Sequence, residues 1–387
     1  MKKRWPRILL SLAALLVVTA VAAAAFLQHP LFGQLPEGNR LSQIQHSPNY
    51  SGGIFVNQID TPLQTTDQSE LSMLLERFQP EKGHPRPPGP TPAVKTDIKA
   101  LDVKQDVVVW LGHSSYYVQL AGQRILIDPV FSENAAPIPR ANLAFEGTSL
   151  YTADDFPDID FLLISHDHYD HLDYPTIVAL RNKIRHVVAG LGVGAHFERW
   201  GYPASKIHEA DWYDQLSLAA GLTIHATPAR HFSGRTFDRD RSLWVGYALV
   251  SSEHRLFFSG DSGYAPHFAE IGRRLGPFDW VTVDTGQYDP RWANVHMNPE
   301  QAAQAAEDLR TRVLTPGHVG RFSIAPHDWD DPFKRIAAAA RGRSYALWTP
   351  EIGQPIYLDG RAQSFVAWWE SNAANTQRRV ATGSEEE

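Results

Sequence analysis

The segment LLISHDHYDHLDY, residues 162–174, places three histidines and three aspartates directly after a run of apolar residues. Such a cluster at the exit of a buried strand would be costly to desolvate without a compensating partner. In an extended chain residues i and i+2 lie on one face, so His166 and His168 can converge on one ion. A turn after them would bring Asp170 and His171 to a second ion. Because imidazole and carboxylate groups are suitable zinc ligands, the segment predicts a metal site. The alternative, a solvated helix start capped by an aspartate, does not require three histidines at this spacing.

The composition limits what else the chain can do. Its 387 residues include no cysteine, which excludes disulfides, thiolate metal sites and a cysteine nucleophile. Histidine, aspartate and glutamate must therefore hold any metal, a ligand set suited to zinc, manganese or iron. With 43% hydrophobic residues the chain can bury one large core or two ordinary ones. The net charge of -7 argues against a nucleic-acid partner.

The N-terminus predicts a membrane segment over residues 1–28. Lys2, Lys3, Arg4 and Arg7 precede an uncharged run from Ile8 to Leu27, and twenty helical residues span roughly 30 Å. Positive charge before the span keeps that end cytoplasmic and predicts an anchored domain on the periplasmic side. The alternative is a cleaved signal peptide, because TAVAAAAF offers small residues for cleavage, and the product would then be an exported soluble form.

The rest of the chain divides into three parts. Residues 29–104 are weakly periodic and Pro-rich near their end, so we expect them to wrap the core or space it from the bilayer, with a short helix over 69–78. Residues 105–370 alternate between consecutive strands and strand–helix pairs, which favours two packed sheets with helices on their outer faces. Residues 371–387 form a polar, acidic tail that we expect to be disordered.

HDHYDH matches the H-x-H-x-D-H signature of the metallo-β-lactamase superfamily. Further segments resemble, in the same order, its branch of N-acyl-phosphatidylethanolamine-hydrolysing phospholipases D. They are WLGHSSYYVQLAGQRILIDPVFS, TPARHFSGR, FFSGDSGY, GPFDWVTVDTGQYDPRW, VHMNPEQA and TPGHVGRF, within about residues 101–322. The resemblance implies an α/β fold, a four-layer αβ/βα sandwich of two mixed β-sheets with helices on the outer faces.

The resemblance also implies a centre of two Zn²⁺ ions, with Mn²⁺ or Fe²⁺ as other options. The first ion would be held by His166, His168 and His231, the second by Asp170, His171 and His318, with Asp261 as the bridge. Two metals can share a hydroxide of lowered pKa, which would attack the phosphorus of a phosphodiester.

Other candidate residues carry less specific signals. Besides Asp170, His296 is a candidate catalytic residue that would orient substrate or donate a proton to the leaving group. Equally, His296 could be an ordinary helix-entry residue, since Asn298 is a good N-cap. By resemblance, His113 and Asp128 would lie near the metal ligands. Tyr288 and Arg291 would line the substrate pocket.

The implied substrate is an N-acylated phosphatidylethanolamine, cleaved to an N-acylethanolamine and phosphatidic acid beside the membrane. A lactonase or small-phosphoester hydrolase on the same metal centre is the main alternative, and a membrane-tethered, non-catalytic metal-binding envelope protein is the second. The dimeric members of the branch leave a homodimer open. Trp368 and Trp369 would either seat the domain at the bilayer or belong to its core.

Overall fold

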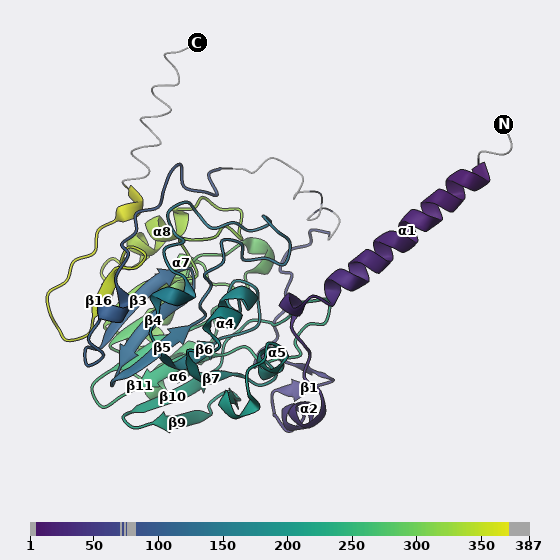
Figure 1. Ribbon diagram of the computed structural model, residues 1–387. Coiled ribbons are helices and arrows are strands. Elements are labelled where there is room, and N and C mark those ends of the chain that lie inside the picture. The colour runs from purple at the N-terminus through teal and green to yellow at the C-terminus, as the bar shows by residue number, and fades with distance from the viewer. Residues whose placement is uncertain (1–4, 70–71, 73–74, 76–82, 371–387) are drawn as a thin grey trace, which may run out of the picture.

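Two mixed seven-stranded β-sheets pack face to face in the computed structural model of the chain (Figure 1). The structure describes residues 5–69, 72, 75 and 83–370. The first sheet has the order β16-β3-β4-β5-β6-β7-β8, and the second has the order β15-β14-β13-β12-β11-β10-β9. In each sheet one half is antiparallel and the other half, from β5 to β8 or from β12 to β15, is parallel.

The strands of the first sheet are β3 (Val107–Gly112), β4 (Ser115–Leu120), β5 (Gln123–Ile127), β6 (Ile159–Ile164), β7 (Ile184–Gly190), β8 (Ile207–Ala210) and β16 (Pro355–Tyr357). Those of the second are β9 (Gln215–Ala219), β10 (Leu222–Thr227), β11 (Gly246–Val250), β12 (Arg255–Phe258), β13 (Trp280–Asp284), β14 (Val313–Gly317) and β15 (Ala346–Leu347). The helices of the domain are α4 (Tyr174–Leu180), α5 (Gly194–Arg199), α6 (His267–Leu275), α7 (Pro299–Asp308) and α8 (Asp331–Ala339).

Three apolar clusters separate the layers. The central one lies between the sheets and joins side chains such as Trp110 and Leu163 to Tyr247 of the opposite sheet. A second cluster packs α4 and α5 against the first sheet, and a third packs α6, α7 and α8 against the other sheet. This order of layers confirms the predicted four-layer αβ/βα sandwich. Trp368 and Trp369 are 2% and 3% exposed in the central cluster, so they are core residues and the suggested seat at the bilayer is wrong.

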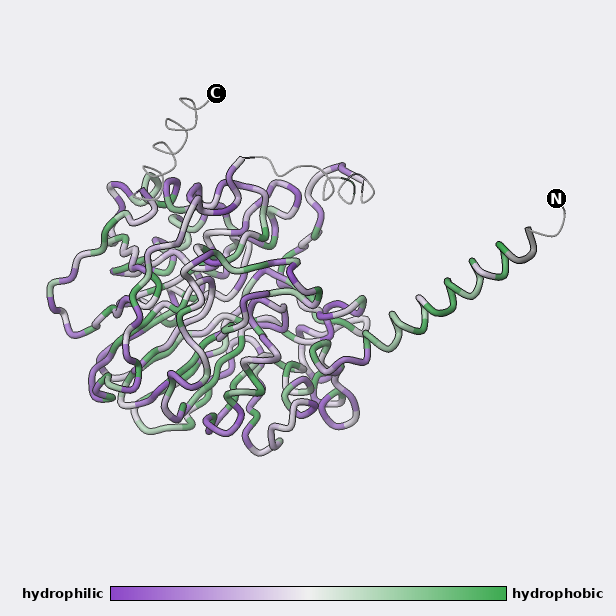
Figure 2. The backbone as a smooth tube through the Cα atoms, turned by 45° about the horizontal axis from the view of Figure 1, so that its top comes forward, coloured by the Kyte–Doolittle hydropathy of each residue, from purple (hydrophilic) through white to green (hydrophobic). Residues whose placement is uncertain are grey.

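The first helix, α1 (Trp5–Leu27), stands away from the domain (Figure 1). Its stretch Ile8–Leu27 is long and apolar enough to cross a membrane, and none of it is buried in the protein. Figure 2 shows the hydrophobic colouring running along this helix. Its composition and position suit an anchor or a signal sequence alike.

Residues 28–104 lie against the domain in their described parts. They include α2 (Gly38–Ile44) and a small hairpin of β1 (Tyr50–Ser51) and β2 (Ile54–Phe55), elements that the weak periodicity of this segment did not predict. The two-residue strands are too short to give a periodic signal. Backbone hydrogen bonds attach this segment to the domain, for example Val94 N to Ile352 O at 2.8 Å. The helix expected over 69–78 falls largely, and the tail 371–387 entirely, outside the described residues.

Candidate metal centre

The predicted ligands follow the ends of four strands at one edge of the sandwich. The loop after β6 carries His166, His168, Asp170 and His171; His231 follows β10, Asp261 follows β12 and His318 follows β14. All of them are buried except His168, which is half-buried. The strand β6 ends at Ile164, so His166 and His168 lie in a loop and not on the extended strand that we had expected. They still converge, because the chain turns at once and His171 N bonds back to His168 O at 3.1 Å.

Three histidines and one oxygen of Asp261 form the first cluster. His168 Nδ1 lies 2.8 Å from His166 Nε2 and 3.2 Å from His231 Nε2. The Oδ2 atom of Asp261 lies 3.8 Å from His166 Nε2 and 3.7 Å from His231 Nε2. The four ligand atoms lie within 4.8 Å of one another, which is the spacing of a single cation site.

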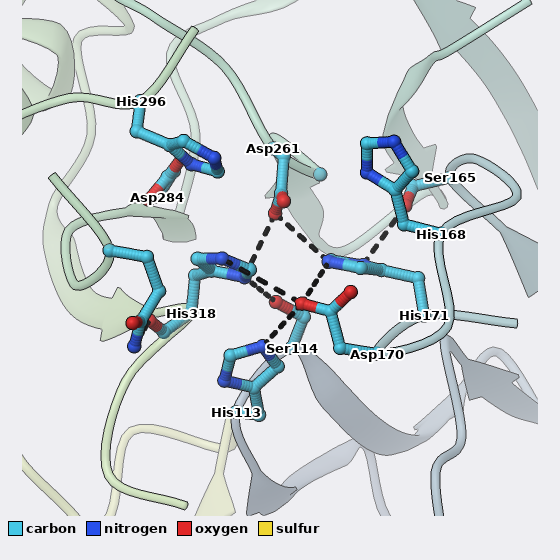
Figure 3. Close-up of polar contacts among 12 residues, drawn as sticks. His113, Ser114, Ser165, His168, Asp170, His171, Asp261, Asp284, His296 and His318 are labelled. Carbon is cyan, nitrogen blue, oxygen red and sulfur yellow. Dashed lines mark hydrogen bonds and ion pairs between the residues drawn. The ribbon is translucent and has the colours of Figure 1, made fainter. Parts of the chain in front are cut away.

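The other oxygen of Asp261 faces the second cluster (Figure 3). Its Oδ1 lies 3.1 Å from His171 Nε2 and 2.9 Å from His318 Nδ1. Asp170 Oδ2 completes the group at 3.5 Å from His171 Nε2. The structure therefore brings all seven predicted ligands together, with Asp261 between the two clusters.

The chemistry of these atoms fits divalent cations. His171 Nε2 and Asp261 Oδ1 are buried and lie 3.1 Å apart, yet neither makes a hydrogen bond of good geometry with the other or with another described residue. Burial, together with the neighbouring histidines, holds the pKa of His166 well below its ordinary value, so its imidazole is neutral and offers a lone pair. Buried polar atoms without a partner are costly, and a bound cation would satisfy both.

Two of the ligand rings, those of His171 and His231, are oriented by acceptors on the side away from the cluster. Asp128 Oδ2 faces His171 Nδ1 at 2.8 Å, and the same carboxylate accepts hydrogen bonds from Ser165 N at 2.7 Å and Ser165 Oγ at 2.6 Å. His231 Nδ1 faces the carbonyl of Val295 at 3.0 Å. These contacts leave the Nε2 atoms of His171 and His231 directed into the cluster, as metal-binding imidazoles require. The expected position of Asp128 near the ligands is what the structure shows.

His113 lies beneath the second cluster. Its Nε2 lies 2.9 Å from Asp170 Oδ2, and its ring centroid is 4.1 Å from that of His318. Burial, with His318 beside it, lowers the pKa of His113 to about 3, so this imidazole is neutral. We infer that His113 donates its Nε2 proton to Asp170 and fixes the direction of that carboxylate.

Comparison with known proteins identifies the family of the domain that carries these residues. The sequence pattern of the β-lactamase superfamily domain matches residues 123–319, a range that is half of the chain and contains all seven clustered residues. The chain belongs to the metallo-β-lactamase superfamily.

Individual relatives refine that membership. An uncharacterized protein of Mycobacterium tuberculosis is 37% identical over 329 residues, 84% of this chain and 88% of the relative. N-acyl-phosphatidylethanolamine-hydrolyzing phospholipase D 1 of Caenorhabditis elegans is 31% identical over 238 residues, 57% of this chain and 65% of that protein. The metallo hydrolase Igni18 of Ignicoccus hospitalis has the same fold, with 20% identity and a TM-score of 0.52 over 67% of this chain and 100% of that structure. The chain is thus a metal-dependent hydrolase by membership.

His296 approaches the metallo-β-lactamase centre from the second sheet. Its Nδ1 lies 2.7 Å from Asp284 Oδ2, and its ring stacks on that of His318 with centroids 5.2 Å apart. A ring nitrogen of His296 lies within 4.8 Å of ligand atoms of Asp261 and His318. Burial opposes protonation, but Asp284 and the cluster carboxylates outweigh it and raise the pKa of His296. The helix-entry reading also describes the structure, because Asn298 caps α7 with a capping box to Gln301.

Tyr288 and Arg291 each contact residues other than the clustered ligands. The Tyr288 hydroxyl bonds to Asp331, and its ring stacks on His327 with centroids 4.5 Å apart. Arg291 pairs with Asp289, with Nε 2.7 Å from Oδ1. A place in a substrate pocket remains a prediction for both.

Three residues that support the site were missed in the sequence. Asp284, the partner of His296, ends the buried strand β13, and an acidic residue at that place is a signal that could have been used. Asn57 bonds the backbone of His231 through its Oδ1 at 3.1 Å and its Nδ2 at 2.8 Å, from 174 residues away. Asp167 lies inside the histidine motif, yet it faces away from the metal cluster towards Gly234 and Ser242. For Asn57 the sequence holds no signal.

Proposed function

We propose that the chain is a dinuclear zinc hydrolase, a phosphodiesterase of the phospholipase D type that acts on N-acyl-phosphatidylethanolamine-like lipids. The division of Asp261 between the two clusters carries the dinuclear part of this proposal. Its two oxygens face different sets of histidines, as a bridging carboxylate must. The chain supplies five ligand histidines and no thiolate, a set that suits Zn²⁺.

The lipid substrate is supported by two further observations. The similarity to the Caenorhabditis elegans phospholipase covers 57% of this chain, at 31% identity. The apolar helix α1 would keep the hydrolase beside a bilayer, which is where such a substrate resides.

The residues around the clusters have separate tasks in this reaction. Bound metal ions would lower the pKa of a coordinated water and neutralise charge on the phosphoryl oxygens. His113 and Asp128 hold Asp170 and His171 in position. His296, fixed by Asp284, is placed to orient the diester or to give a proton to the departing alkoxide oxygen.

The test is hydrolysis by the full chain in detergent, loaded with Zn²⁺, on three substrate panels: bis-(p-nitrophenyl) phosphate, vesicles of an N-acyl phospholipid, and lactones. We expect turnover of the phosphodiester and of the lipid. Cleavage of lactones alone would support the lactonase, and metal binding without any turnover would support the non-catalytic protein.

Matched variants distinguish hydrolysis at the metal centre from hydrolysis by a contaminating enzyme. His166→Ala and Asp170→Asn should each lower turnover by more than roughly 100-fold, since even loss of a residue behind a ligand costs about 10–100-fold. His46→Ala changes an exposed histidine whose ring contacts Ser42 O and no clustered residue, and it should leave turnover intact. Retained hydrolysis in both cluster variants would show that the reaction takes place elsewhere.

A further inference from the structure

Residues 232–242, here called the anchor-side loop, connect the predicted ligand His231 to β11 and lie beside the end of α1. A cavity of about 370 Å³ separates the two. Leu27, the last residue of α1, lines one wall, and Thr236 and Asp238 line the other. Phe237, the residue between Thr236 and Asp238 in the chain, is on the same loop as this lining and is itself exposed.

The anchor-side loop is bonded to the metal-site loop and to the chain that leaves α1. The guanidinium of Arg235 is 5% exposed and donates to Leu31 O from Nε at 3.0 Å and from Nη2 at 2.7 Å. Its Nη1 donates to the carbonyls of Asp167 at 2.7 Å and Leu172 at 2.8 Å. The position of the loop is thus tied both to the metal site and to α1.

The start of the chain after α1 is also attached to α5 and the residue after it. Arg199 Nη2 donates to Gln28 O at 2.8 Å, and Trp200 Nε1 donates to Pro30 O at 2.8 Å. These bonds attach the residues directly after α1 to the domain, the first of them one residue beyond the end of the helix. If α1 crosses a bilayer, its end and the anchor-side loop must therefore lie at the same membrane surface.

Phe237 is 91% exposed, the highest value among the large apolar side chains of the described residues. An exposed phenylalanine ring is unfavourable in water and favourable at the boundary of headgroups and acyl chains, where Phe, Trp and Leu of interfacial segments are buried. Arg239 lies close by, with its guanidinium carbon 5.8 Å from the Phe232 ring centroid. An exposed aromatic tip with an exposed arginine two residues away suits the headgroup region of a phospholipid bilayer.

The charged residues that line the cavity complement the charges of a zwitterionic headgroup. Arg199 and Arg241 line it, and the Nε atom of Arg241 is buried without a hydrogen-bond partner among the described residues. Three acidic residues line it as well: Asp167, which is buried, and Glu37 and Asp238, which are at exposed positions. Arginines suit a phosphate, and the carboxylates suit the ammonium of phosphatidylethanolamine.

We propose that the anchor-side loop is a second membrane contact, in which Phe237 enters the interface of the bilayer that α1 spans and the cavity holds a phosphatidylethanolamine headgroup. The proposal requires α1 to remain as an anchor and does not depend on the proposed hydrolysis. Its effect is to set the metal site at the bilayer surface. The loop begins with Phe232, whose ring packs on His168 and His231 at centroid distances of 4.5 and 4.6 Å.

The absence of cysteine from the sequence makes a direct test available. Phe237→Cys in the full chain, labelled with an environment-sensitive fluorophore, is reconstituted into vesicles of phosphatidylethanolamine and phosphatidylglycerol. The control is Val366→Cys, since Val366 is 63% exposed and close to the C-terminal end of the described residues. We expect a nitroxide on the upper acyl chain to quench the label at 237 by at least about half, and the label at 366 to be quenched only by aqueous iodide. Equal response of both labels to iodide, with no quenching by the lipid, would overturn the membrane contact.

Binding of the headgroup in the cavity is tested separately from the insertion of Phe237 into the bilayer. In detergent, a short-chain phosphatidylethanolamine should raise the thermal midpoint of the wild-type chain, and the Arg241→Gln variant should lose most of this rise. An equal rise with inorganic phosphate would contradict a headgroup site and indicate a simple anion site. An unchanged response in Arg241→Gln would show that the lipid binds elsewhere. Neither the quenching nor the midpoint requires hydrolysis, so the two proposals can fail independently.

Discussion

Replacing Asp128 by asparagine should weaken metal binding by roughly 10–100-fold. The carboxylate accepts Ser165 N at Oδ1 and Ser165 Oγ at Oδ2, and Oδ2 also faces His171 Nδ1. Asp128 has a φ of 43°, in the left-handed region that asparagine tolerates about as well as aspartate. Asp128→Asn therefore changes the hydrogen bonding and keeps the backbone.

The size of the effect follows from the two ways the new amide can lie. If its NH₂ group faces Ser165 N–H, two donors meet, and a buried donor without an acceptor costs about 1–3 kcal/mol. If the NH₂ group faces His171, Nδ1 must accept, so the proton moves to Nε2, the atom 3.1 Å from Asp261 Oδ1. That proton would block the lone pair that a metal needs. A loss of about 1.4–2.8 kcal/mol of binding free energy corresponds to a dissociation constant for zinc that is 10–100 times larger.

The assay is competition for Zn²⁺ between the full chain and a fluorescent chelator of known affinity. The control is Asp211→Asn, the same change at an aspartate that accepts from Ser47 Oγ at 2.6 Å and Asn49 Nδ2 at 2.7 Å and contacts no clustered ligand. The control should bind zinc as the wild type does. Equal zinc affinity of Asp128→Asn and the wild type would refute the idea that Asp128 fixes the tautomer of His171.

Three further predictions concern the metal and the pH. Chelation should lower the thermal midpoint by about 5 °C or more, because a ligand at 100 times its dissociation constant adds about 2.7 kcal/mol, and renewed Zn²⁺ should restore it in a thermal scan. Asp261→Asn should reduce the metal content, measured by elemental analysis, from two ions per chain to one or fewer; an unchanged content would argue against a bridge. Burial holds the pKa of His267 at about 3, below the ordinary 6.5, so the folded chain binds fewer protons there than the unfolded chain and stability falls as the pH drops below about 6.5. The loss between pH 7.5 and 5 in denaturant titrations should be smaller by about 2 kcal/mol in His267→Gln than in the wild type, and equal losses would contradict this.

The central strands could be predicted because burial leaves a continuous apolar run. β3 is buried at all six of its residues and β13 at all five, and their sequences show it. The edge strands β8, β9, β15 and β16 gave no such signal. Their residues are largely half-buried or exposed, so pairing with a neighbour, and not their own composition, determines their conformation.

The metal site was predictable to the extent that its residues are local in sequence. The histidine motif concentrates His166, His168 and His171 within six residues, and the chemistry of that spacing is recognisable without a fold. Single residues such as His231 and Asp261 had to be supplied by family resemblance. The role of Asn57 depends on a contact across 174 residues, so it becomes visible only when the chain is folded.

The pairing of β16 with β3 has a consequence for how the protein is made. The register joins Pro355 to Val109 and Tyr357 to Val107, so the strand that opens the first sheet gains its outer neighbour about 250 residues later. During synthesis β3 offers an unpaired apolar edge, which is a template for aggregation. In a product truncated before residue 355 that edge of β3 would stay unpaired. Chaperone protection of the nascent chain would matter until almost the whole polypeptide has left the ribosome.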